Sequence, residues 1–303
     1  MALPAKKPCA ARRPRTSKQQ AAMEYLMTYG WAILVVAIVV VAIFSLGLFN
    51  PSNLGPKARA GSCQIYRPEG IWTAAFINLE GTCNNAVPEF VAQFNGGSYI
   101  LISNPDLFDS GTFTVTAWVN INNPSTFHTL IGREMSTQGW NFLLSSSGAL
   151  GLRIDTNTIT NYALYPPTPT LNDNKWHFIA AVVNLSTAQY LYQDGILTSS
   201  SSSNIGSFTQ TGGTLNLMYS GQGTGCCTQG EMANVQIYNT TLSHNDIVSL
   251  YDEGIGGVPL ALNHLTLWLP LNGNPIDYSG NIDSGTDYGD YYNTFWTNGY
   301  TIP

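Results

Sequence analysis

Charged side chains are scarce, since Asp, Glu, Lys and Arg make up only 10% of the 303 residues while hydrophobic residues make up 44%. No acidic residue precedes Gln20, whereas six of the twelve basic residues do. From Gln20 onward, six basic residues accompany eighteen acidic ones, which is a net charge of −12. Because so acidic a chain repels phosphate backbones, nucleic acid is excluded as a partner.

The sequence also lacks recognisable catalytic motifs. Its four histidines are scattered, none belongs to an HExxH motif, and no nucleophile elbow is recognisable. A glycoside hydrolase needs two carboxylates that face each other across a cleft, and no stretch carries closely alternating carboxylates. We therefore expect no enzymatic activity. His177, inside an apolar stretch, is interpreted as a structural residue.

Cysteine is sparse, with five residues, and Cys9 lies in the basic leader. The remaining four form an even set, which favours disulfides in an exported domain. We expect Cys63 to pair with Cys83 and to close a strand–turn–strand unit over residues 63–88, worth about 3 kcal/mol in the chain-entropy model. Cys226 and Cys227 form either a vicinal bridge or bonds to separate partners. Zinc is the rival interpretation, which the adjacent cysteines suit poorly.

One long apolar run occupies residues 31–49. It reads WAILVVAIVVVAIFSLGLF without a charge, and as a helix at ~1.5 Å per residue it crosses a ~30 Å hydrocarbon core. Only a helix satisfies every backbone group of a single segment in lipid. The positive-inside rule keeps the basic leader in the cytoplasm and places residues after Phe49 outside. A secretory signal peptide would need a shorter apolar region, so an uncleaved anchor is the main alternative to a processed segment.

A more specific pattern lies between the basic leader and this run. The string QAAMEYLMTYGWAILVV, which begins at Gln20, resembles the class III signal peptides of archaeal type IV pilin-like proteins. The resemblance implies that a prepilin peptidase cuts between Gln19 and Gln20, after the basic Lys18. Gln19 departs from the Gly or Ala that is usual there. A carboxylate beside an apolar helix needs a partner, and the resemblance implies that Glu24, with Tyr25 beside it, serves assembly by reaching the α-amino group of a neighbouring copy.

These features predict the organisation of the N-terminal region. Residues 1–19 form a basic leader, and residues 20–49 form a hydrophobic helix. An all-round apolar helix must be buried, so this one lies in the membrane first and in a filament core afterwards. Residues 50–62 form a linker in which Pro51 and Pro56 stop the helix. The expected partners are the membrane, the prepilin peptidase and further copies of this chain.

Everything after the linker has the short, turn-separated apolar stretches of an all-β protein. Asp194-Gly195 after YLYQ predicts a hairpin. One helix is expected, with Ser243 as its N-cap and Gly254 at its end. The serine run Ser199–Ser203 is expected to be a flexible hairpin loop. The predicted strands are Thr112–Asn120, Lys175–Asn184, Gln189–Gln193 and Glu231–Asn239.

The order of these segments carries a second resemblance. The strings FNGGSYI, FTVTAWV, KWHFIAAVV, YLYQDGIL and EMANVQIYNTTLSHNDIVSLYDEG follow one another and resemble the laminin G-like, concanavalin A-like jelly roll over residues 89–256. The expected fold class is mainly β, with a long N-terminal hydrophobic α-helix before a β-sandwich jelly roll. The resemblance also implies binding of glycans or protein ligands through loops at one end of the sandwich, in some members with calcium.

The tail, residues 257–303, contains a strand and a loop out of their usual order. The sequence of residues 265–285 resembles the opening of a laminin G-like domain, yet it comes last. Either the tail supplies the missing first strand of its own sandwich, or it pairs with a neighbouring subunit. We expect it to pack on its own sandwich, since an unpaired edge strand must be covered. Asp277, Asn281 and Asp283 offer oxygen ligands spaced for calcium, and an Asx-rich turn is the alternative.

Two N-glycosylation sequons begin at Asn184 and Asn239. Two functions fit the sequence as a whole. The first is a pilin-like subunit that moves from the cell membrane into an archaeal surface filament, with a helix-bundle core and an outward laminin G-like domain for adhesion or for glycan or protein binding. The second is a single-span, membrane-anchored adhesin or carbohydrate-binding receptor that does not polymerise.

Overall fold

The computed structural model describes residues 29, 31–41, 63–66, 74–77, 79–80, 87–103, 110–121, 128–135, 137–166, 169–210, 212–219, 228–281, 283–289 and 291–294. The chain divides into two compact units, Met1–Gly55 and Pro56–Pro303. In the first unit, residues 31–41 are helical and expose apolar side chains such as Trp31 and Val36. No helix within the described ranges is both long and apolar enough to span a membrane.

Several predicted site residues lie outside the described residues. They are Lys18, Gln19 and Gln20 of the cleavage site, Glu24 and Tyr25 of the assembly site, and the cysteines Cys83, Cys226 and Cys227. Cys63 begins strand β1 (Cys63–Tyr66), which pairs antiparallel with β2 (Ala74–Ile77). β1 and β2 therefore form an antiparallel strand pair, while the disulfides stay predictions.

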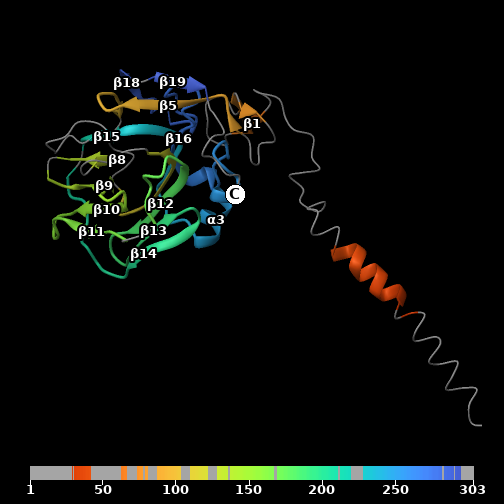
Figure 1. Cartoon of the computed structure of the whole chain (residues 1–303). Helices are drawn as coiled ribbons and strands as arrows, with labels where there is room; N and C mark the ends of the chain where they lie inside the picture. The colour runs from red at the N-terminus through yellow and green to blue at the C-terminus, as the bar shows by residue number, and fades with distance from the viewer. Residues whose placement is uncertain are drawn as a thin grey trace, which may run out of the picture. The chain divides into compact units, whose positions relative to one another are not determined.

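Two antiparallel sheets form the sandwich of the second unit (Figure 1). The seven-stranded sheet has the order β11-β10-β9-β8-β15-β6-β18. The eight-stranded sheet has the order β14-β13-β12-β7-β16-β5-β19, and β17 also pairs with β16. The mainly β sandwich predicted from the sequence is confirmed.

The strand bounds follow chain order. The seven-stranded sheet comprises β6 (Tyr99–Ile102), β8 (His128–Glu134), β9 (Gly139–Leu144), β10 (Leu150–Asp155), β11 (Tyr162–Leu164), β15 (Thr214–Leu217) and β18 (Thr286–Tyr288). The eight-stranded sheet comprises β5 (Phe90–Asn95), β7 (Thr112–Asn120), β12 (Trp176–Asn184), β13 (Ala188–Gln193), β14 (Ile196–Ser201), β16 (Gln229–Tyr238), β17 (Leu265–Leu269) and β19 (Tyr291–Thr294). A short pair, β3 (Leu79–Glu80) and β4 (Val87–Pro88), precedes them.

Alternate side chains of the strands fill the space between the sheets. In β7, Phe113, Val115 and Val119 point into this core, because successive residues of a strand face opposite sides. Phe113 stacks on Trp140 of the opposite sheet with ring centroids 5.1 Å apart. The outward-facing Trp118 of the same strand belongs to a second hydrophobic layer. The apolar alternation of TFTVTAWVN therefore decides which face of β7 meets the other sheet.

Helix α3 (His244–Asp252) packs on the outer face of the eight-stranded sheet. Its Ile247 and Leu250 pack in the same hydrophobic layer as Trp118 and Phe178 (Figure 1).

The predicted helix and the four predicted strands are confirmed within about two residues at each end. Ser243 accepts a hydrogen bond from the backbone N–H of Asp246 and forms a capping box with it, and Gly254 follows the helix at φ +82°. The hairpin turn Asp194-Gly195 has positive φ at both residues, as a type I′ turn requires.

The prediction that the serine run Ser199–Ser203 is a loop is wrong for its first three residues, while Ser202 and Ser203 lie outside any strand. Ser199, Ser200 and Ser201 belong to β14, which pairs antiparallel with β13. The free edge of β13 presents backbone groups that need partners, and a tight hairpin brings the serine backbone directly beside them. The Thr198 hydroxyl also donates to the Leu191 carbonyl at 3.0 Å. Tertiary pairing therefore outweighs the weak intrinsic strand preference of serine.

The C-terminal tail pairs with strands of its own chain. β17 lies antiparallel to β16 with every residue buried, β18 extends the seven-stranded sheet beside β6, and β19 extends the other sheet beside β5. Of the two alternatives for the tail, the structure shows the one in which the tail strands pair within their own chain.

Candidate functional site

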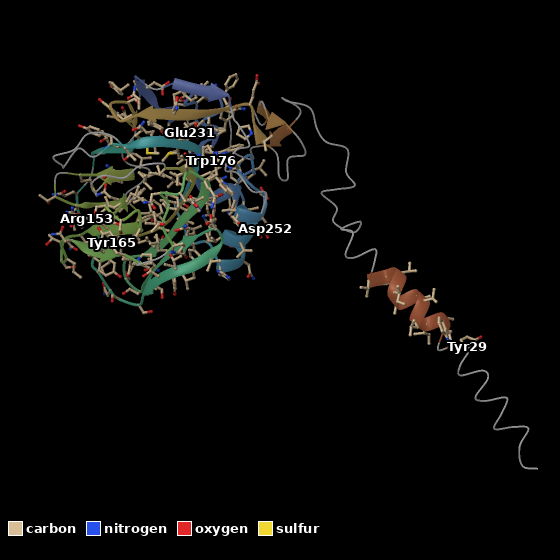
Figure 2. All side chains as sticks on the ribbon, in the orientation of Figure 1. Tyr29, Arg153, Tyr165, Trp176, Glu231 and Asp252 are labelled. Carbon is tan, nitrogen blue, oxygen red and sulfur yellow. The ribbon has the colours of Figure 1, made fainter. Side chains whose placement is uncertain are left out.

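A polar cleft lies at one end of the outer face of the eight-stranded sheet. The pairing register places Gln93 of β5 opposite Glu231 of β16, and Glu231 opposite Asn120 of β7. Three polar side chains from three neighbouring strands therefore share one face in one row. Trp176 of β12 continues the row beyond Asn120. Figure 2 labels Glu231 and Trp176, the two residues that flank Asn120 in this row.

Amide groups dominate the lining of this cleft, which encloses about 210 Å³. Side chains from the ends of β5 and β7, from the start of β16 and from the loop before β12 meet there. The floor includes Gly230, where a Cβ atom would lie only 2.6 Å from the backbone oxygen of Asn120. The polar lining residues are Gln93, Asn95, Asn120, Asn174, Gln229 and Glu231.

The cleft holds hydrogen-bond acceptors that the protein leaves underused. The Asn120 side-chain amide donates to Glu231 Oε2 at 3.4 Å, and Asn120 Oδ1 is buried with no hydrogen-bond partner within the described part of the chain. Burial raises the pKa of Glu231 above its usual range. A buried acceptor without a donor costs about 1–3 kcal/mol. A ligand donor would recover that cost only if the Asn120 side chain turned its buried Oδ1 toward the cleft.

The sequence alone does not reveal this cleft. The predicted strands ended at Asn120 and began at Glu231, but no local pattern distinguished these polar strand ends from ordinary solvent-facing positions. Only the pairing register brings residues 93, 120 and 231 together.

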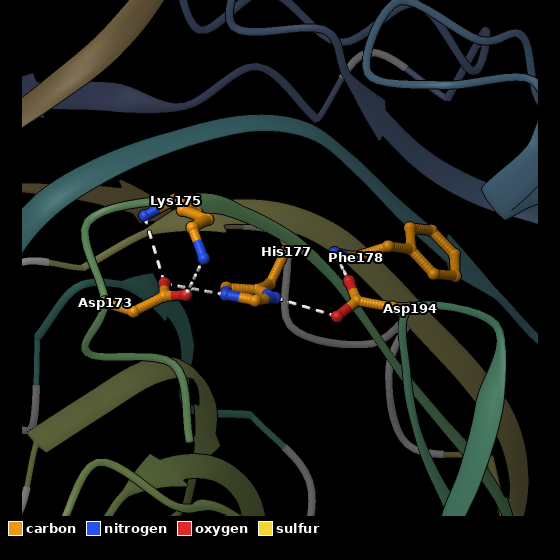
Figure 3. A network of polar contacts seen from close by, with 5 residues as sticks. All are labelled: Asp173, Lys175, His177, Phe178 and Asp194. Atoms are coloured by element: carbon orange, nitrogen blue, oxygen red, sulfur yellow. Dashed lines mark hydrogen bonds and ion pairs between the residues drawn. The ribbon is translucent and has the colours of Figure 1, made fainter. Parts of the chain in front are cut away.

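A charged network holds the loop that carries Asn174. His177 donates from Nδ1 to Asp194 Oδ2 at 2.8 Å and from Nε2 to Asp173 Oδ1 at 2.9 Å (Figure 3). Lys175 Nζ lies 2.9 Å from Asp173 Oδ2. Asp194 Oδ1 accepts from the backbone N–H of Phe178 at 2.9 Å. Asp173 and Lys175 flank Asn174, so the network fixes one wall of the cleft and agrees with a structural role for His177.

Both ring nitrogens of His177 lie within hydrogen-bond distance of carboxylates, an arrangement that favours the charged imidazolium with a proton on each nitrogen. Burial alone would lower the pKa of His177, but the hydrogen bonds and charges of Asp194 and Asp173 outweigh it and raise the pKa above 6.5. The pKa of Asp173 is lowered, because its bonds to His177 and Lys175 outweigh partial burial.

The network should make stability depend on pH. A raised folded-state pKa of His177 stabilises the fold fully below its unfolded value of about 6.5, and this contribution is lost as the pH rises through the folded value. We expect urea midpoints to fall over that window in the native chain and to fall less in His177→Gln. The difference between the two curves isolates His177 from other titrating groups. Parallel curves would contradict the prediction.

The predicted calcium residues form a hydrogen-bonded turn. Asp277 Oδ1 accepts from the backbone N–H groups of Trp268 at 3.0 Å and Ser279 at 2.8 Å. Asp277 Oδ2 accepts from the Ser279 hydroxyl at 2.7 Å and from the backbone N–H of Asp283 at 3.1 Å. Asn281 Nδ2 donates to the carbonyl of Thr266 at 2.7 Å. This is the geometry of the Asx-rich alternative. Within the described ranges, no group of three His, Cys, Asp or Glu residues is arranged to hold a metal.

The two sequons lie at the end of the sheet opposite to the cleft. Asn184 ends β12 and Asn239 directly follows β16, and these two strands run parallel to each other on either side of β7. The cleft lies where the same strands begin. Eight residue steps along β12 therefore separate Trp176 from Asn184, which is about 26 Å at ~3.3 Å per residue.

Comparisons with known proteins agree with this architecture. No curated protein matches the chain. A crystal structure of a Bacteroides ovatus protein considered to be carbohydrate binding matches with a TM-score of 0.54 and 18% identity, over 68% of this chain and 60% of that protein's length. The heptameric SAP-like pentraxin of Limulus polyphemus matches with a TM-score of 0.51 and 15% identity, over 68% of this chain and 95% of the pentraxin. At these identities the likeness concerns the fold alone.

A family model matches residues 94–248, from the end of β5 into helix α3. Its description is the concanavalin A-like lectin/glucanases superfamily. Because the matched segment makes up just over half of the 303 residues, this chain belongs to the concanavalin A-like lectin/glucanases superfamily.

Proposed function

We propose that the sandwich binds a neutral glycan in the amide-lined cleft and that the chain displays this sandwich on a surface filament. The observation that carries the binding role is the row of amide and carboxylate side chains, Gln93, Asn120 and Glu231, which three neighbouring strands bring to one cleft. Sugars present closely spaced hydroxyl groups, and each hydroxyl both donates and accepts. The cleft offers the matching set of amide and carboxylate groups. The similar Bacteroides ovatus protein, considered to be carbohydrate binding, supports the same assignment.

The charge of the cleft favours neutral over acidic sugars. Glu231 is the acidic residue of the lining, and it lies half-buried beside Asn120. Coulomb repulsion grows as water is removed from between like charges. A sugar carboxylate or sulfate in contact with Glu231 would therefore be disfavoured, while a hydroxyl donor would form a charge-assisted hydrogen bond.

The binding role is tested with the full chain on a panel of immobilised neutral and sialylated glycans. We expect a neutral glycan to bind to the native chain. Asn120→Ala and Glu231→Gln should each raise the Kd for that glycan by about tenfold, which corresponds to one lost hydrogen bond of ~1.4 kcal/mol. Asn141→Ala is the matched control, because Asn141 has the same 9% exposure as Asn120 but lies on the other sheet. Equal affinity of all four proteins, or no bound glycan, would contradict the proposal.

The filament role rests on the apolar N-terminal segment. Residues 31–41 are helical with apolar side chains exposed all round, 72% for Trp31 and 66% for Val41. Such a helix is stable only when lipid or other apolar helices cover it. The string that begins at Gln20 places Glu24 where the pilin-like pattern has its assembly carboxylate. The cover we propose is the membrane first and then the same helices of neighbouring copies, which associate through Glu24 and Tyr25 after cleavage by the prepilin peptidase.

Mass spectrometry of the mature chain and electron microscopy of the cell surface test the filament role. We expect a mature N-terminus at Gln20 and filaments that disappear in Glu24→Ala while the melting temperature of the sandwich is unchanged. Glu69→Ala, at the next acidic residue along the chain, should leave the filaments intact. A mature chain that begins at Met1 or Ala2, or normal filaments from Glu24→Ala, would favour the tethered, non-polymerising receptor instead.

A further inference from the structure

An open groove of about 770 Å³ occupies the sequon end of the outer face of the eight-stranded sheet. Its floor is apolar and aromatic, and it includes Tyr190, Tyr192 and Leu197 from β13 and β14 together with His244 at the start of α3. Tyr192 stacks on His244 with ring centroids 5.7 Å apart, and Leu197 is 43% exposed. Exposed apolar surface of this kind is costly in water unless something covers it.

Asn184 lies on the rim of this groove with its amide nitrogen available. Its Oδ1 accepts from the backbone N–H of Ser186 at 3.0 Å. Its Nδ2 makes no hydrogen bond to the described residues. Ser186 and Thr187 are exposed in the turn that joins β12 to β13. The sequon Asn184-Leu185-Ser186 therefore presents its acceptor nitrogen outward on an accessible hairpin.

The strand register brings the aromatic floor within reach of that nitrogen. Asn184 pairs with Ala188, and Val182 pairs with Tyr190. Tyr190 is therefore the diagonal neighbour of Asn184 on the same face, at a Cβ separation of about 7–8 Å, and a group attached to Asn184 reaches its ring. The second sequon differs, because Asn239 Oδ1 lies 3.1 Å from His264 Nδ1 and Asn239 does not line the groove.

We propose that Asn184 carries an N-linked glycan whose first sugars lie in this groove, against Tyr190 and Leu197. The modification forms a bond between Asn184 Nδ2 and the anomeric carbon of an oligosaccharide. The donor is a lipid-phosphate-linked oligosaccharide. Its anomeric carbon–oxygen bond breaks, the lipid phosphate leaves, and the amide gives up one proton. The inference rests on the export that the proposed function includes, and it does not depend on glycan binding in the cleft.

The glycan covers surface that would otherwise be exposed beside the hairpin. A volume of about 770 Å³ falls within the ~300–1,000 Å³ of small-molecule sites, so it is large enough for more than one sugar ring. The polar rim, with Thr187 and Thr241, faces the sugar hydroxyls, while the tyrosines face the apolar faces of the rings. Because the cleft lies about 26 Å away along β12, a glycan on Asn184 leaves the cleft open.

The test compares the exported full-length chain with two variants. Ser186→Ala removes the Asn184 sequon but keeps Asn184 and the backbone N–H that bonds to it. Asn239→Gln removes only the other sequon. Glycopeptide mass spectrometry reports occupancy, and hydroxyl-radical footprinting reports the exposure of Tyr190. We expect an occupied Asn184, a Tyr190 oxidation rate at least threefold higher in Ser186→Ala, and no change in Asn239→Gln.

An unmodified Asn184 in the exported chain would overturn the inference. An oxidation rate of Tyr190 that is equal in the native chain and in Ser186→Ala would also overturn it, because the glycan would then not lie on the groove. Binding to the immobilised glycan panel separates this inference from the proposed cleft, since Ser186→Ala should bind the panel as the native chain does.

Discussion

Replacing Asn234 with alanine should lower the free energy of unfolding by roughly 3–6 kcal/mol, because three buried polar groups each lose their partner at ~1–3 kcal/mol. Asn234 Nδ2 donates to the carbonyl of Gly257 at 2.8 Å. Its Oδ1 accepts from Trp268 Nε1 at 2.8 Å and from Gln236 Nε2 at 3.0 Å. This one side chain thus connects β16 to the tail strand β17 and to the loop after α3. Asn234 also has φ +50°, which alanine tolerates less well than asparagine.

Urea unfolding of the full chain in mild detergent measures this effect. Tyr238→Phe is the comparison within the same network, since it keeps Asn234 and removes the bonds of the Tyr238 hydroxyl, which donates to Gln236 Oε1 at 2.6 Å and accepts from the backbone of Leu260. It should cost about 1–3 kcal/mol. If Asn234→Ala unfolds within 1 kcal/mol of the native chain, the network does not hold the tail in place.

Replacing Asp277 with asparagine should lower the free energy of unfolding by roughly 2–4 kcal/mol, while added calcium or chelator should leave the native melting temperature unchanged. Four donors converge on the Asp277 carboxylate: the backbone N–H groups of Trp268, Ser279 and Asp283 and the Ser279 hydroxyl. An asparagine keeps one acceptor and turns an NH₂ group toward donors, so bonds worth ~1.5–3 kcal/mol each are lost. The bond from the Trp268 N–H ties this turn to β17.

Asn281→Asp separates the turn from the calcium alternative. A second carboxylate beside Asp277 would strengthen a calcium site. In the turn it removes the donor that serves the carbonyls of Leu265 and Thr266 and adds repulsion between carboxylates. We therefore expect Asn281→Asp to be less stable with or without calcium. A melting temperature that rises by several degrees with calcium in the native chain or in this variant would make the site a cation site.

The strands and the helix were predictable because their signals are local. Period-two alternation in TFTVTAWVN predicts both a strand and its buried face, and Ser243 as an N-cap residue predicts where α3 begins. The prediction for the serine run failed because the strand conformation of Ser199–Ser201 comes from pairing with the edge of β13 and not from the serines themselves. The network of His177 could also not be predicted from the sequence, since it joins residues from a loop, a strand and a hairpin turn.

The sequence by itself determined the class of the fold, the position of the apolar segment, the hairpin at Asp194-Gly195 and the two sequons, because each depends on residues close together in the chain. Only the tertiary structure decided the cleft, the role of the tail and the groove beside Asn184. Gln93, Asn120 and Glu231 become neighbours through strand pairing across long stretches of chain. That register follows from burying one face of every strand at once, which is a property of the whole sandwich.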